Sequence, residues 1–141
     1  MQNIECLAKT AENAWPGAVE RIGDEGFTLD AGGFKLLFCI REGSGETGLC
    51  RAEIGNLDDL ADPGAFAEAA LEGNFFWNGT DGAALSYRAK DGKAYLTGVF
   101  PADALEDDPQ AFSSFADGMA RTAQDWRLRF SNFAKSGKEA R

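Results

Sequence analysis

Histidine is absent from this 141-residue sequence, and its absence excludes much of the usual active-site chemistry. Without an imidazole the chain can form no Ser-His-Asp triad, no histidine-activated cysteine and no histidine-ligated metal site. Carboxylates and lysines are still available for catalysis. We therefore expect a protein that is not an enzyme and that carries no cofactor or metal ion, and keep a carboxylate-based enzyme as the weakest hypothesis.

Cysteine is scarce as well. The three cysteines, Cys6, Cys39 and Cys50, are an odd number and contain no CxxC pair. This pattern indicates buried thiols in a reducing compartment rather than a disulfide framework. Cys39 and Cys50 fall on neighbouring predicted strands and could approach each other, but two thiols alone make a poor metal site.

Signals for export and for membrane insertion are also lacking. The first six residues have no basic start, and they lead into no apolar run of roughly 7–15 residues such as a signal peptide contains. No stretch approaches the roughly 20 apolar residues that span a bilayer. These observations predict a cytoplasmic protein without membrane insertion.

Basic residues are fewer than acidic ones: 14 against 23, which gives a net charge of −9. Residues 121–141 carry six basic and two acidic side chains, so residues 1–120 carry −13. A surface this negative repels phosphate backbones. Nucleic acid is therefore not an expected partner.

Apolar residues, by contrast, are plentiful. They make up 44% of the chain, and 16 residues are aromatic. A chain of this length and composition can bury a core without disulfides or metals. We predict one domain over residues 1–134, followed by a basic, flexible tail at residues 135–141.

Hydrophobic periodicity and turn residues predict an α+β fold. Residues 4–22 have near-helical apolar spacing, and Pro16-Gly17 should break or kink that helix midway. Asp62-Pro63 and Asp108-Pro109 each provide an N-cap followed by a first-turn proline. Strands are predicted at 27–29, 34–41, 49–54, 83–88 and 94–100, the first three as a meander and the last two as a hairpin around Asp91-Gly92. The expected order is α-β-β-β-α-β-β-α, with a twisted antiparallel sheet flanked by helices.

Two motifs invite a functional interpretation that their context does not support. Residues 43–48 (Gly-Ser-Gly-Glu-Thr-Gly) match the GxGxxG pattern, but a strand rather than a helix should follow, and Glu42 and Glu46 would repel phosphate. We interpret them as a hairpin loop. Acidic clusters at 58–59 and 106–108 precede helices, where carboxylates favour the helix dipole, so capping explains them better than calcium binding.

The predicted strand 34–41 is apolar on both faces. Phe34, Leu36, Phe38 and Ile40 share one face, and Leu37 and Cys39 lie on the other. Either the protein's own helices cover both faces of the sheet, or one face is left for a partner.

Residues 71–76 (Leu-Glu-Gly-Asn-Phe-Phe) resemble the leucine-x-x-asparagine-apolar signature that ends the middle helix of class I type III secretion chaperones, the Tir chaperone family. Residues 48–55 resemble that family's third strand, and residues 84–87 with Asp91-Gly92 resemble its fourth strand and hairpin. Phe112, Phe115 and Trp126 resemble its terminal helix. The resemblance spans roughly residues 25–130; the chain departs from it at Pro16-Gly17.

This resemblance implies an α+β homodimer that binds the N-terminal segment of a secreted effector without ATP and keeps it export-competent. The first helix and the meander would bind the effector, whose added strand would pair with a sheet edge. We predict that six residues form this surface: Phe27, Leu29, Leu37, Cys39, Ile4 and Leu7. Apolar residues near the end of the middle helix predict a dimer interface at Trp77, Leu85 and Tyr87. The alternative is a small dimeric protein-binding or regulatory module of the same fold with a folded partner.

Overall fold

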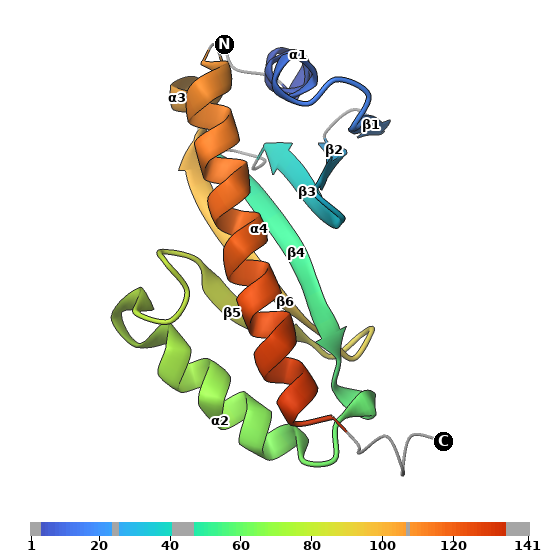
Figure 1. The fold of residues 1–141 in the computed structure, drawn as a ribbon, viewed down its shortest axis with the longest axis vertical. Helices are drawn as coiled ribbons and strands as arrows, with labels where there is room; N and C mark the ends of the chain where they lie inside the picture. The colour runs from blue at the N-terminus through green and yellow to red at the C-terminus, as the bar shows by residue number, and fades with distance from the viewer. Residues whose placement is uncertain (1–3, 24–25, 41–46, 107, 135–141) are drawn as a thin grey trace.

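The computed structural model describes residues 4–23, 26–40, 47–106 and 108–134. Its described strands form a six-stranded antiparallel sheet with the order β1-β2-β3-β4-β6-β5 (Figure 1). The elements are α1 (Ile4–Ala14), β1 (Val19–Ile22), β2 (Gly26–Ala31), β3 (Phe34–Ile40), β4 (Thr47–Asn56), α2 (Pro63–Asn74), β5 (Ala84–Arg88), β6 (Lys93–Pro101), α3 (Ala102–Glu106) and α4 (Pro109–Asn132), with short 3-10 helices η1 (Leu57–Asp59) and η2 (Phe75–Trp77).

The α+β class, the meander and the final hairpin are confirmed, with β1 and α3 as additional elements. The predicted break of the first helix at Pro16-Gly17 is confirmed, because α1 ends at Ala14, whereas the helical continuation to residue 22 is wrong. Gly17 adopts φ +80°, and its N–H donates to the Glu12 carboxylate at 2.7 Å, so the chain turns sharply after α1. Val19–Ile22 then pairs with β2 as the outermost strand.

The predicted helix starts are confirmed in detail. The Asp62 side chain accepts a hydrogen bond from the Ala65 N–H at 3.1 Å, and the Asp108 side chain accepts one from the Ala111 N–H at 3.0 Å. Most of the GxGxxG segment lies outside the described residues, but β4 begins at Thr47, so a strand does follow it. The predicted tail at 135–141 also lies outside the described residues.

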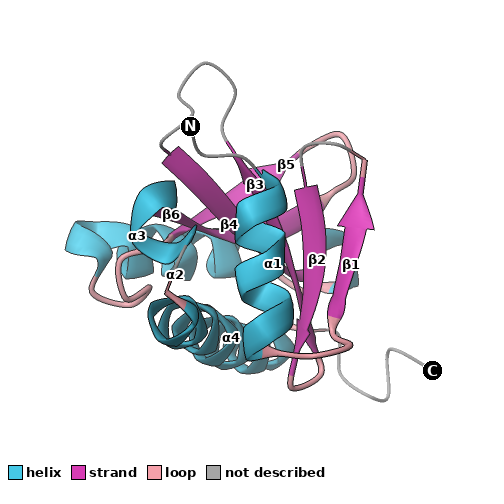
Figure 2. Cartoon of the chain, turned by 90° about the horizontal axis from the view of Figure 1, so that it is seen from above, coloured by secondary structure: helices cyan, strands magenta, loops and turns pink. Residues whose placement is uncertain are grey.

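Helices α1 and α4 cover one face of the sheet, and the core lies between the two layers (Figure 2). Phe38 occupies its centre, with ring centroids 5.1 Å from Phe27 and 5.0 Å from Phe112. Along α4 one face is buried against this core, and its residues are Phe112, Ala116, Met119, Ala123, Trp126 and Phe130.

The opposite side of the sheet, which we call the open face, has no helix packed over it among the described elements. Strand register places Leu37 beside Arg51, and Arg51 beside Thr97, on this face. Val99 and Ile22, on the same side, are 61% and 51% exposed. Of the two alternatives for the sheet, coverage of both faces by the protein's own helices is therefore not observed among the described elements.

Candidate partner-binding surfaces

The sheet separates the six predicted partner-binding residues into two groups. Ile4, Leu7, Phe27 and Leu29 are all buried, because α1 packs over β2 and against α4. The prediction that they line an exposed surface is wrong: their apolar faces are covered by the protein itself.

Leu37 and Cys39 lie on the open face and are half-buried. Cys39 is in register with Leu49, and Leu49 with Val99, so three apolar side chains cross adjacent strands at one level of the sheet. We call Leu37, Cys39, Leu49 and Val99 the apolar stripe. An apolar stripe on an uncovered sheet face is the kind of surface that accepts a protein segment.

The cysteines form no disulfide. Cys50 faces the core, where burial, followed by the neighbouring Cys39 thiol, raises the pKa of Cys50 well above its usual value. The expectation of a buried thiol is confirmed for Cys50. It is wrong for Cys6 and Cys39, which are half-buried.

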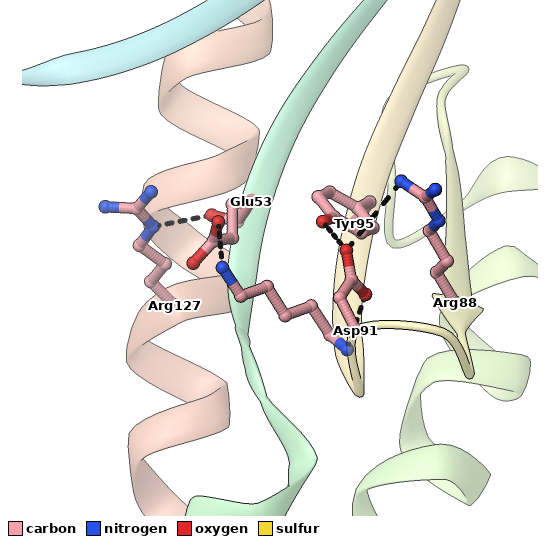
Figure 3. Close-up of polar contacts among 6 residues, drawn as sticks. Glu53, Arg88, Asp91, Tyr95 and Arg127 are labelled. Carbon is pink, nitrogen blue, oxygen red and sulfur yellow. Dashed lines mark hydrogen bonds and ion pairs between the residues drawn. The ribbon is translucent and has the colours of Figure 1, made fainter.

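A polar network joins the β5–β6 hairpin to β4 on the open face (Figure 3). The Tyr95 hydroxyl donates to Asp91 at 2.5 Å; this bond raises the pKa of Tyr95 and is the main reason that the pKa of Asp91 is lowered. The Lys93 ammonium donates to Glu53 at 3.1 Å, which raises the pKa of Lys93. Arg51 stacks over the Tyr95 ring at 4.5 Å, so Tyr95 is only 7% exposed although it belongs to the open face.

A cleft of about 310 Å³ opens next to this network, where β3 separates from β4. Arg127 reaches it from α4: its Nε donates to the Glu53 carbonyl at 2.9 Å, and its guanidinium lies 4.4 Å from the centre of the Phe34 ring. We call this the basic cleft; its lining is Ile22, Thr28, Lys35, Leu37, Arg51, Glu53, Tyr95 and Arg127.

The three predicted dimer residues lie near one another at the other end of the sheet. Trp77 and Tyr87 are exposed, whereas Leu85 is buried. Between α2 and β5 an apolar cavity of about 210 Å³ is lined by both Leu85 and Tyr87. Around it lie further exposed apolar side chains, and we call the whole set the aromatic patch: Leu71, Phe75, Phe76, Trp77 and Tyr87, each between 56% and 73% exposed.

The signature asparagine has a structural role at this site. The Asn74 amide donates to the Leu85 carbonyl at 3.0 Å and accepts from the Leu85 N–H at 2.8 Å. It thereby satisfies part of the outer edge of β5, which would otherwise be unpaired. Phe76 and Trp77 then adopt φ +50° and +57°, a region that non-glycine residues rarely occupy.

The sequence prediction missed Leu71, Phe75 and Phe76 as exposed residues of this patch, Arg51 and Tyr95 as residues of the open face, and Arg127 as a residue of the basic cleft. The run of three aromatics at the end of a helix was an available signal for the first group. No local pattern identifies the second group, because Arg127 comes from a helix that packs mainly on the other side of the sheet.

The described ranges contain no group of acidic and cysteine side chains that could hold a metal ion. Nor do they include a helix long and apolar enough to cross a bilayer.

Comparison with known proteins identifies the family. Residues 25–127 match the model of the Tir chaperone protein (CesT) family. The chain belongs to this family. No curated protein sequence is similar enough to count as a relative.

Solved structures with the same fold support this assignment. A chain in the crystal structure of the ExsC–ExsE complex has a TM-score of 0.69 at 16% identity, over 89% of this chain and 91% of that one. A chain in the HopA1–SchA chaperone–effector complex has a TM-score of 0.64 at 14% identity, over 89% and 92%. A chain in the heterodimeric ExoU–SpcU complex, from the type III secretion system of Pseudomonas aeruginosa, has a TM-score of 0.62 at 16% identity, over 91% and 97%. The resemblance drawn from the sequence is thus confirmed for the family and the fold.

Proposed function

We propose that this Tir-family protein is a cytoplasmic chaperone that binds the N-terminal segment of a type III secretion effector and keeps it export-competent. The observation that carries the proposal is the uncovered sheet face, with its apolar stripe, in a chain of this family. One similar structure is described as a chaperone–effector complex and another comes from a type III secretion system, which agrees with this role.

The mechanism is binding rather than chemistry. Among the described strands β1 pairs only with β2, so its outer edge offers backbone amides and carbonyls to an added strand. The apolar stripe offers contacts for the side chains of an extended segment. Both interactions are available without ATP, since neither needs a conformational change driven by hydrolysis.

We also propose that the functional unit is a homodimer. The aromatic patch and the cavity between α2 and β5 form a contiguous apolar surface that is unusual on a monomer of this size. A second copy of the same chain can cover it about a twofold axis, the commonest symmetry of protein assemblies.

Leu37→Glu and Val99→Glu test the effector site, because both side chains lie on the open face and neither belongs to the core cluster. Each variant should fold, as checked by circular dichroism, and should lose most copurification with secreted proteins coexpressed from the same genome. Leu128→Glu is the matched control, because Leu128 is as exposed as Val99 but lies on α4. Full copurification by both open-face variants would place the effector elsewhere.

The alternative of a folded partner is distinguished by the state of the bound protein. A chaperone of the proposed kind leaves the bound effector segment extended, so limited proteolysis should cut its unbound flanks while the covered residues are protected. A partner that resists proteolysis as a compact domain would favour the regulatory-module hypothesis.

A further inference from the structure

The side chains that line the basic cleft are mainly positive, whereas the chain as a whole is negative. The protein carries a net −9, yet the cleft lining contains three cations, Lys35, Arg51 and Arg127, and one acidic residue, Glu53. A concave surface with one dominant sign of charge concentrates the field at its centre. A ligand in the cleft therefore responds more to the positive charge of the lining than to the net charge of the protein.

The cations of the cleft are only partly neutralised. Within the described chain, neither Lys35 nor Arg51 forms an ion pair, and Arg127 uses its Nε on a carbonyl group rather than on a carboxylate. Glu53 is engaged by Lys93, which lies outside the lining. The Arg51 guanidinium stacks on the Tyr95 ring, and its N–H groups form no ion pair with any described residue, so they remain available as donors.

Other acidic groups lie on the outer side of the cleft. Asp30 is the cross-strand neighbour of Lys35, and Glu20 is that of Thr28. Neither carboxylate comes within ion-pair distance of a cleft cation in the described structure. Asp91 also lies beside the cleft, because its carboxylate accepts from the Tyr95 hydroxyl, but its ion pair within the described residues is with Arg88. The inner side thus presents two guanidinium groups, Arg51 and Arg127, that form no ion pair with a described carboxylate.

Apolar side chains adjoin the cations. Ile22 and Leu37 line the same cleft, and Leu37 is also part of the apolar stripe. A ligand that fills the cleft thus meets a pair of guanidinium groups flanked by aliphatic surface. The matching chemistry is a carboxylate next to an apolar side chain, because arginine binds carboxylates through two parallel hydrogen bonds.

We propose that the basic cleft binds an acidic side chain of the effector segment, while an apolar neighbour of that side chain contacts Ile22 and Leu37. The segment is then selected by an aspartate or glutamate beside an apolar residue, and not by a basic character complementary to the net charge. This inference rests on the proposed chaperone function, whose own test is copurification.

The experiment uses three fluorescein-labelled 14-residue peptides with alternating leucine and serine that differ only in a central Glu, Gln or Lys. Anisotropy titrations with the full chain at low salt should show the Glu peptide binding about tenfold more tightly than the Gln peptide, and the Lys peptide most weakly. Added salt should reduce the difference in affinity between the peptides.

Arg51→Gln should abolish the preference for the Glu peptide, and Arg51→Lys should retain only part of it. Arg121→Gln, at an exposed position on α4, is the matched control and should behave like the wild type.

Equal binding of the Glu and Gln peptides, or binding of neither, overturns the inference. So does an Arg51→Gln protein that melts like the wild type and retains the preference. Competition by a single-stranded oligonucleotide as effective as that by the Glu peptide would identify a general polyanion site and would also overturn it. If the wild type still copurifies with a secreted protein in any of these cases, the proposed function stands without the acidic selectivity.

Discussion

Trp126 connects three separate parts of the chain. It lies on α4, its Nε1 donates to the Gly79 carbonyl at 2.7 Å, and a Cβ on Gly73 would lie 2.4 Å from its ring. The ring thus fills the space that the missing side chain of Gly73 leaves at the end of α2. Its burial is complete.

Trp126→Ala should therefore destabilise the protein by about 3–5 kcal/mol, because it leaves a large cavity and removes the partner of a carbonyl. Chemical denaturation followed by circular dichroism measures the loss. Leu128→Ala, at an exposed position on the same helix, should change the stability by no more than about 0.5 kcal/mol. Equal stabilities for the two variants would contradict the assignment of Trp126 to the core.

At the level of residues, the sequence could predict which side chains share a face but not what covers that face. The period-2 pattern of residues 34–40 correctly separates Leu36 and Phe38 from Leu37 and Cys39. The same reasoning assigned Phe27 and Leu29 to a partner surface, although α1 and α4 bury them. An apolar pattern is the same whether the covering surface belongs to the chain or to a partner, so only the tertiary structure could decide.

At the level of elements, the main error of the sequence prediction was to miss strand β1, and the reason is that this strand is short. Over the four residues Val19–Ile22 the two apolar positions are three residues apart, which fits a helix better than an alternating strand. The sequence could locate the end of the helix, because Pro16 and Gly17 mark it, and Gly17 lies in the left-handed region. The hydrogen bond from the Asp30 N–H to the Ala18 carbonyl, which attaches the next segment to β2, is a contact that a local pattern does not contain.

Asn74 gives a test at the same scale, because one side chain joins helix α2 to strand β5 through two hydrogen bonds. Asn74→Ala should lower the stability by about 1–3 kcal/mol, since it leaves a half-buried strand edge without partners. Hydrogen exchange at the Leu85 amide should accelerate more than exchange in β3. Glu68→Ala, on the exposed side of α2, is the control. Unchanged exchange at Leu85 in Asn74→Ala would show that β5 does not depend on this contact.

At the level of the whole molecule, the aromatic patch predicts a dimer. Light scattering coupled to size exclusion should report twice the 15.1 kDa of one chain at micromolar concentration. Leu71→Glu and Trp77→Glu place charges on the patch and should shift the protein towards the monomer, whereas Leu128→Glu should not. A wild-type protein that is monomeric at these concentrations would refute the dimer, whatever the variants do.

The one-sided packing of the sheet has a consequence for how such a protein can change over generations. Side chains alternate along each strand, so neighbouring positions are subject to different selection: one maintains the fold and the next meets the partner. A substitution on the open face need not cost stability, as it would in the core, and partner preference can drift while the scaffold stays intact. Homologues with divergent sequences and a common backbone are the expected outcome. The most variable positions among them should then follow every second residue of β3, β4 and β6.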